Sequence, residues 1–140
     1  MLAAASLTIG ERLGEVIAEA RVIDSRPVGP SLRRYANGAL LLRTALSPPE
    51  LLEALKAIER AFGRRRGGQR WGSRVLDLDI VLWNGGRFAS PALTIPHAAF
   101  RTRGFVLEPA AAIAPRWRDP LTGLTLRQLR ARLTARRALP

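Results

Sequence analysis

Residues 75–83, VLDLDIVLW, carry the most regular pattern in the chain and limit its fold most strongly. Apolar side chains alternate with Asp77 and Asp79, which is the period of a β-strand with one buried face. The two carboxylates then share a face, with Cα atoms roughly 6.5 Å apart at about 3.3 Å per residue. Because like charges repel, the pattern indicates either pairing with surface arginines or a bound hard cation such as Mg²⁺.

The rest of the chain predicts a mixture of helices and strands. Ser47 and Glu50 form a capping-box pattern ahead of an apolar stripe, which predicts a helix that ends at Gly63. The other predicted elements are helical segments over 2–14 and 125–137, strands over 16–24 and 35–44, and a strand that passes into a helical turn over 105–112. This order predicts a single α+β domain over residues 1–140.

Composition excludes several kinds of chemistry. The chain has no cysteine, which rules out disulfides, thiolate zinc sites and iron–sulfur clusters. His97 is the only histidine, so a site with several histidine ligands is excluded. No apolar run reaches the roughly 18 residues that a membrane helix needs, and the first residues do not form a signal-peptide pattern. We therefore expect a cytoplasmic protein with no membrane partner.

Positive charge is concentrated in the second half of the chain. The net charge is +12, but residues 1–60 hold 8 basic and 7 acidic side chains, whereas residues 61–140 hold 15 and 4. This asymmetry predicts an anionic partner: a nucleic acid, an acidic membrane or a phosphorylated small molecule. Composition does not choose among these three.

A basic stretch, residues 64–70 (RRRGGQR), lies beside the predicted strand of the two aspartates. Alone, such a run is most simply a solvated surface. Next to a carboxylate pair, arginines fit the parts needed for phosphoryl transfer, in which cations surround a polyphosphate. The chain contains neither a Walker A sequence nor a G-x-G-x-x-G loop, so a nucleotide would be bound without either device.

Four segments in order resemble the 6-hydroxymethyl-7,8-dihydropterin pyrophosphokinase family of folate biosynthesis. They are RWGSRVLDLDIVL (70–82), RPVGP with YANGA (26–39), the stretch from Ser47 to Arg66, and residues 93–115. The resemblance covers about residues 22–130. It implies a ferredoxin-like α/β sandwich with an antiparallel sheet. It also implies transfer of pyrophosphate from ATP to the pterin with two Mg²⁺ ions, release of AMP, a monomer, and no nucleic-acid partner.

The same resemblance implies a role for each matching residue. Asp77 and Asp79 correspond to the pair that holds the two Mg²⁺ ions, and Arg64 and Arg74 to basic residues that hold active-site loops and phosphates. The positions that match ATP-binding residues are Glu59, Arg66, Ile80, Thr94, His97 and Arg103. The positions that match the pterin pocket are Val28, Tyr35, Asn37, Trp71 and Phe105. The Phe105 ring is expected to stack on the pterin, and the Asn37 amide to read its polar edge.

The chain departs from the family pattern at its beginning. Family members open with a strand carrying a glycine–serine–asparagine turn, roughly YIALGSNLG, that is normally central in the sheet. This chain begins inside the helix that follows, so we expect the sheet to lack its first strand and to expose strand edges. Either the true start lies upstream, or the chain is an inactive homologue.

Two further points leave alternatives open. Ala92 stands where family members often have a phosphate-contacting arginine, for which Arg87 is a candidate substitute, and Ala98 stands where some members have an aromatic residue. The basic second half also fits a nucleic-acid-binding module, a different class of protein. Such a module would bind with an affinity that falls steeply with salt.

Overall fold

The structure is a computed structural model that describes residues 1–25, 35–65 and 76–138. Its elements, in chain order, are α1 (Leu2–Arg12), β1 (Glu15–Glu19), β2 (Ile23–Ser25), β3 (Tyr35–Asn37), β4 (Leu40–Arg43), α2 (Pro48–Arg65), β5 (Phe88–Ala89), β6 (Thr94–Ile95), the 3₁₀ turn η1 (Phe100–Thr102), α3 (Gly104–Ile113) and α4 (Leu126–Ala138). The chain thus combines helices with antiparallel strands, and the predicted α+β class is confirmed.

The strands of the described residues form three antiparallel pairs, β1 with β4, β2 with β3, and β5 with β6. The two long predicted strands are therefore each divided. One break falls at residues 20–22 and the other at Gly38 and Ala39, where the Ala20 N–H still donates to the Ala39 carbonyl at 2.8 Å. The result is one antiparallel ribbon with an interruption at the same level on both sides.

Helix α2 begins as the capping box predicts. The Ser47 N–H donates to Glu50 Oε1 at 2.9 Å, and the Glu50 N–H donates to Ser47 Oγ at 3.4 Å. The predicted end at Gly63 is wrong, because the helix continues to Arg65. A glycine that ends a helix usually adopts a positive φ. Among the described glycines, positive φ values occur at Gly86 and Gly123 and not at Gly63.

Helix α3 corrects another prediction. Residues 105–112 are helical from the start rather than a strand that passes into a turn. Leu107, Ala111 and Ala114 recur at helical spacing, and all three are buried against Leu126 and Leu129 of α4. Packing on that partner selects the helix, although β-branched and aromatic residues at its start favour a strand.

Residues 76–82 run as an extended segment and not as the predicted strand. The burial alternates as expected, since Leu76 is buried and Leu78 and Ile80 are half-buried, whereas Asp77 and Asp79 are exposed. A strand also needs a ladder of hydrogen bonds to a neighbour. The described residues provide none to this segment; the Val81 carbonyl accepts one bond, from the His97 N–H at 3.0 Å.

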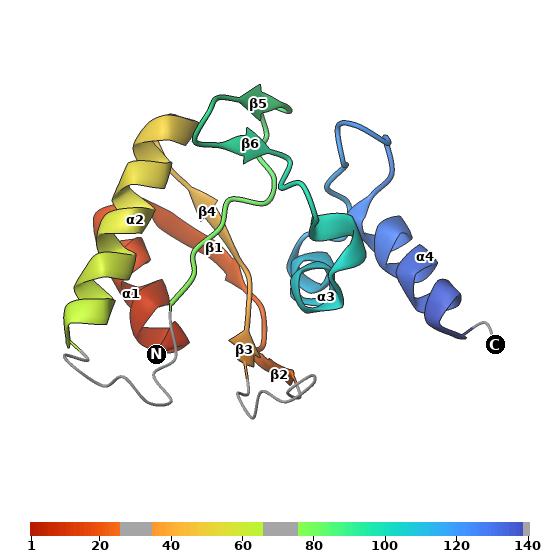
Figure 1. The fold of residues 1–140 in the computed structure, drawn as a ribbon, viewed down its shortest axis with the longest axis horizontal. Coiled ribbons are helices and arrows are strands. Elements are labelled where there is room, and N and C mark those ends of the chain that lie inside the picture. Colours follow the sequence, from red (N-terminus) through yellow and green to blue (C-terminus); the bar gives the residue numbers. More distant parts are fainter. Residues whose placement is uncertain (26–34, 66–75, 139–140) are drawn as a thin grey trace.

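Two apolar clusters lie on opposite sides of the ribbon formed by β1 and β4, with α1 and α2 on one side and α3 and α4 on the other (Figure 1). The first cluster joins α1 and α2, and the partly buried side chains of β4 and of Leu78 and Ile80 pack against it. The second joins η1, α3 and α4, and Val81 and Leu82 pack against it. The extended segment therefore connects the two clusters.

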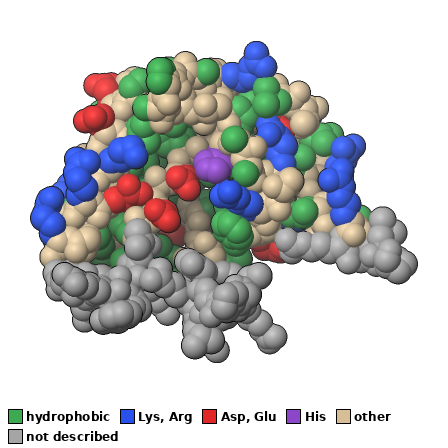
Figure 2. All heavy atoms as spheres, viewed as in Figure 1, with side chains coloured by type: hydrophobic (Ala, Val, Ile, Leu, Met, Phe, Trp, Pro, Cys, Tyr) green, Lys and Arg blue, Asp and Glu red, His purple; other side chains and the backbone are tan. Residues whose placement is uncertain are grey.

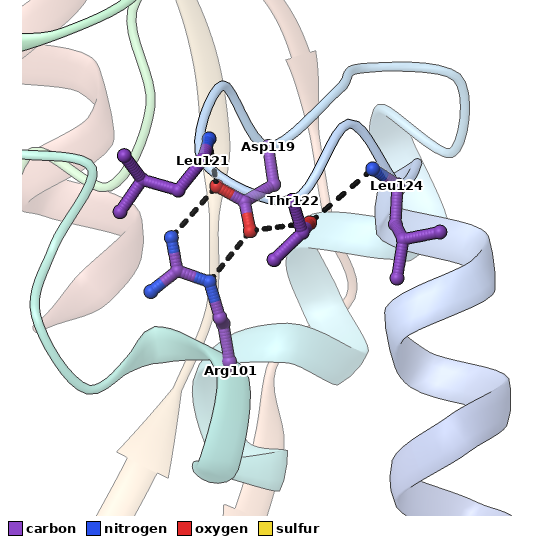
Figure 3. A network of polar contacts seen from close by, with 5 residues as sticks. All are labelled: Arg101, Asp119, Leu121, Thr122 and Leu124. Carbon is purple, nitrogen blue, oxygen red and sulfur yellow. Dashed lines mark hydrogen bonds and ion pairs between the residues drawn. The ribbon is translucent and has the colours of Figure 1, made fainter.

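A buried ion pair ties η1 to the turn before α4 (Figure 3). Arg101 donates from Nε to Asp119 Oδ2 at 2.5 Å and from Nη2 to Oδ1 at 2.7 Å, and the Asp119 side chain is fully buried. The Thr122 hydroxyl and the Leu121 N–H donate to the same carboxylate. Burial raises the pKa of Asp119, but the bonds from Arg101, Thr122 and Leu121 outweigh it and lower the pKa to about 2.

Because the pKa of Asp119 is lowered in the folded protein, the free energy of unfolding decreases in acid. The carboxylate stabilises the fold fully above its unfolded pKa near 3.8, and this contribution is lost as the pH falls through about 2. A pKa lowered from 3.8 to about 2 corresponds to about 1.4 kcal/mol per pH unit across that interval, so the difference in unfolding free energy between the wild type and Asp119→Asn should shrink by about 2 kcal/mol between pH 5 and pH 2. Urea unfolding of both proteins across that range measures it. A difference that stays constant with pH would contradict the assignment.

Candidate functional site

The two aspartates of the extended segment are placed outward by the core behind them. Leu76, Leu78 and Ile80 pack on the first apolar cluster, so Asp77 and Asp79, which alternate with them, lie at the surface. Their carboxylates are free to face solvent or a ligand, as the sequence pattern predicts.

Glu59 of α2 holds the middle of this segment. Its Oε2 accepts a hydrogen bond of 2.6 Å from the backbone N–H of Leu78, the residue between the two aspartates. A bond from an amide to a carboxylate is stronger than one between neutral groups. Glu59 therefore acts on the backbone that carries Asp77 and Asp79, a contact that sequence reasoning missed because it joins residues distant in the chain.

Replacing Glu59 with alanine should loosen the segment that carries the aspartates. A charge-assisted hydrogen bond contributes about 1.5–3 kcal/mol. For the Mg²⁺–ATP that the family resemblance implies as ligand, we therefore expect the affinity to fall by about tenfold or more. Isothermal titration with a non-hydrolysable ATP analogue measures this change. Glu53→Ala, at an exposed position of the same helix, is the control and should have no effect. An unchanged nucleotide affinity in a folded Glu59→Ala protein would refute this role.

His97 lies next to the second aspartate. Its Nε2 is 4.0 Å from Asp79 Oδ2, and the two side chains are 27% and 62% exposed. The Ala99 N–H donates to His97 Nδ1 at 3.3 Å. In a neutral imidazole the other nitrogen then carries the proton, so Nε2–H points to the Asp79 side. Figure 2 shows the single histidine between a group of acidic side chains and neighbouring basic ones.

The remaining predicted residues fall into three groups. Arg103 caps α3, and its guanidinium lies 5.9 Å from the centre of the Phe105 ring, which is 42% exposed. Thr94 and Arg64 are exposed, in β6 and near the end of α2, and Asn37 is partly buried in β3. The residues outside the described part of the chain are Val28, Arg66, Trp71 and Arg74, together with the side chain of Tyr35.

The donors present suit a hard cation only in part. Among residues 1–25, 35–65 and 76–138, no three histidine or acidic side chains gather closely enough to enclose a metal ion. Two exposed carboxylates on one side of a segment are, however, the donor set of Mg²⁺, which keeps several waters and completes its shell with substrate phosphates. Asp77 and Asp79 fit an ion that arrives with a nucleotide rather than one that is fully enclosed by protein.

Exposed carboxylates, a histidine and arginines on one face of an α+β fold are the parts expected in the class of proteins that handle a phosphorylated ligand with a metal ion. The comparisons with known proteins identify the family. The model of the 7,8-dihydro-6-hydroxymethylpterin-pyrophosphokinase family (HPPK) matches residues 1–115. The chain belongs to this family.

Individual relatives agree with the family match. A 2-amino-4-hydroxy-6-hydroxymethyldihydropteridine pyrophosphokinase of Synechocystis is 50% identical over 105 residues, which are 75% of this chain and 53% of the relative. The protein of the same name from Pseudomonas aeruginosa is 44% identical over 119 residues, 83% of this chain and 73% of the relative. A folate synthesis bifunctional protein of Arabidopsis thaliana is 45% identical over 76 residues, 54% of this chain and 16% of the relative. The chain thus spans about half the length of the Synechocystis relative.

The described part of the chain has no helix that is both long and apolar enough to cross a membrane.

Proposed function

We propose that this chain transfers a pyrophosphoryl group from ATP to the hydroxymethyl group of 6-hydroxymethyl-7,8-dihydropterin and releases AMP. The observation that carries the proposal is the approach of His97 to Asp79, at 4.0 Å, within the part of the chain that the family model matches. Two segments with the family's motifs come together there on an exposed surface.

The reaction needs no nucleophile from the protein. The pterin hydroxyl oxygen forms a bond to the β-phosphorus of ATP, and the bond from that phosphorus to the oxygen shared with the α-phosphate breaks. The electron pair of that bond leaves on AMP, and the hydroxyl proton passes to water. Positioning and electrostatic stabilisation then account for catalysis, which agrees with a chain that has no cysteine and presents carboxylates and arginines.

Two Mg²⁺ ions, held by Asp77 and Asp79 with the ATP phosphates, would supply neutralisation of the phosphate charge. Around them, each matched residue keeps the role that the family resemblance implies. The phosphate and nucleotide contacts come from Arg64, Arg74, Glu59, Arg66, Ile80, Thr94, His97 and Arg103. The pterin contacts come from Val28, Tyr35, Asn37, Trp71 and Phe105. We expect a monomeric, cytoplasmic enzyme.

We also propose that a further strand completes a ferredoxin-like sheet between β4 and residues 76–82. Side chains of both pack on the same cluster of α1 and α2. Among the described residues, β4 is paired on one edge, by β1, and the extended segment has no ladder at all. Backbone groups on such edges are ready to pair with an added strand.

A peptide with the family's opening sequence, YIALGSNLG, should stabilise the chain by pairing there. At a concentration tenfold above its dissociation constant, the peptide should raise the free energy of unfolding by about 1.4 kcal/mol. Thermal unfolding monitored by circular dichroism and hydrogen exchange of the amides of residues 76–82 measure the effect. A scrambled peptide is the control. Equal effects of both peptides, or no added protection of these amides, would count against the strand.

The proposed activity is tested by AMP formation from ATP, Mg²⁺ and the hydroxymethyl-dihydropterin. AMP should appear only when all three are present. No AMP, together with retained pterin binding, would support the inactive-homologue alternative. Salt-dependent binding of RNA or DNA without AMP formation would support the nucleic-acid-binding alternative, although the exposed Asp77 and Asp79 would repel a phosphate backbone.

A further inference from the structure

His97 and Arg103 belong to one short connection, residues 96–103, between β6 and α3. At its beginning, the His97 N–H bonds to the Val81 carbonyl at 3.0 Å. Within it, the Phe100 N–H bonds to the His97 carbonyl at 3.4 Å and the Thr102 N–H to the Ala99 carbonyl at 3.3 Å. These long local bonds shape the turn, but they do not fix where the turn lies on the protein.

The turn η1 is fixed by contacts with α3 and α4 and with the turn that precedes α4. The Phe100 side chain is fully buried there. The Arg101 guanidinium lies 4.7 Å from the centre of the Phe100 ring and makes its two hydrogen bonds with Asp119 (Figure 3). A planar guanidinium bound at two points to a carboxylate sets orientation as well as distance.

Asp119 is itself held rigidly. Its backbone N–H donates to the Leu124 carbonyl and its carbonyl accepts from the Gly123 N–H, both at 2.8 Å. Its side-chain oxygens accept from Thr122 and Leu121 as well as from Arg101. The turn of residues 119–124 is therefore a fixed anchor to which Arg101 attaches. The family model matches residues 1–115, so the anchor lies beyond the matched part.

We propose that the Arg101–Asp119 pair positions the nucleotide-binding residues of this chain: by fixing η1 it holds His97 opposite Asp79 and Arg103 at the start of α3. The inference rests on the proposed function for its consequence, which is selective. Arg101 belongs to the same connection as His97 and Arg103, two of the proposed nucleotide contacts. Asn37, a proposed pterin contact, lies in β3 and is not part of this connection. Phe105, the other described pterin contact, lies in the first turn of α3 next to Arg103. Loss of the pair should therefore weaken nucleotide binding more than pterin binding.

The first test measures both dissociation constants by isothermal titration, with the Mg²⁺ complex of a non-hydrolysable ATP analogue and with the pterin. Asp119→Asn should weaken nucleotide binding by about tenfold or more, the size of effect that is typical when a residue orienting a metal ligand is removed. Arg101→Lys, which keeps the charge but loses the two-point contact, should have an intermediate effect. The matched control is Arg118→Ala, because the Arg118 side chain is exposed and bonds the same turn at the Gly123 carbonyl rather than at the Asp119 carboxylate.

Equal weakening for both ligands would indicate a purely structural role and overturn the proposal, as would an unchanged nucleotide affinity in folded Asp119→Asn. If Asp119→Asn does not fold, Arg101→Lys decides by the same criteria.

A second measurement separates this proposal from the proposed function. Because His97 is the only histidine, its imidazole gives a unique pair of signals in the proton NMR spectrum. In the ligand-free protein, these signals should shift in Asp119→Asn and Arg101→Lys but not in Arg118→Ala. The amides of Phe100 and Thr102 should exchange faster in the first two. If the wild type binds no nucleotide, the proposed function fails, while shifted imidazole signals still support the positioning of His97. Unshifted signals and unchanged exchange overturn it.

Discussion

Replacing both Asp77 and Asp79 with alanine should reduce AMP formation by at least about a thousandfold, because loss of a single group that stabilises transition-state charge already costs about 10²–10³ in kcat. Both carboxylates are exposed and carried by one extended segment, so the change removes charge without opening a cavity in the core. The double variant should therefore fold normally. Steady-state assays at saturating pterin, with circular dichroism of the purified protein, measure both expectations.

The control variant removes a carboxylate from an exposed position outside the proposed site. Glu53→Ala, on the exposed side of α2, should retain full activity. Pterin affinity should be unchanged in the double variant, because the aspartates are proposed to act on the metal and the phosphates. Retained activity in a folded double variant would refute the metal assignment while leaving the family membership untouched.

Replacing Phe100 with alanine should cost about 3–5 kcal/mol of unfolding free energy, the usual range for a buried phenylalanine. Its side chain is fully buried between η1, α3 and α4, and the Arg101 guanidinium lies beside the ring. The variant creates a cavity and also removes the ring beside which the Arg101 guanidinium lies. A loss of this size is a large fraction of the stability of an ordinary domain. Urea unfolding followed by tryptophan fluorescence measures it.

Leu121→Ala is the matched control for this result. Leu121 lies in the turn that holds Asp119, but its side chain is 53% exposed, so its removal should change the unfolding free energy by less than about 0.5 kcal/mol. Similar costs for Phe100→Ala and Leu121→Ala would mean that the second cluster is not a packed core.

Local sequence rules predicted the elements whose signals lie within a few residues. The predicted capping box at Ser47 forms. The helix predicted over 125–137 begins in the same way, with the Thr125 N–H donating to Gln128 Oε1 at 2.9 Å and the Gln128 N–H donating to Thr125 Oγ1 at 3.1 Å. The alternation around Asp77 and Asp79 predicted which side chains are exposed, because burial depends on side-chain periodicity whether or not a ladder forms.

Features that depend on distant partners could not be predicted in the same way. The alternating pattern of residues 76–82 contains no information about whether a neighbouring strand is available, and among the described residues none is. Helix α3 forms because α4 covers it. In the sequence, Asp119 has arginines as its nearest charged neighbours. Nothing near it indicates that its partner is Arg101, which precedes α3 in the chain whereas Asp119 follows it.

The candidate site was predicted only in part, because some of its contacts also join residues that are distant in the chain. Family motifs named His97 and Asp79, and the fold places them 4.0 Å apart. The hydrogen bond from the Leu78 N–H to Glu59 was not foreseen, since a family motif records which residue is present and not which backbone group it contacts.

The most direct test of the proposed pyrophosphoryl transfer is the identity of the nucleotide product. Phosphorus NMR of a reaction with ATP, Mg²⁺ and the hydroxymethyl-dihydropterin follows all products together. Attack at the β-phosphorus predicts AMP and a pterin diphosphate ester in equal amounts, with no ADP. Formation of ADP and a pterin monophosphate, or consumption of ATP without a phosphorylated pterin, would contradict it.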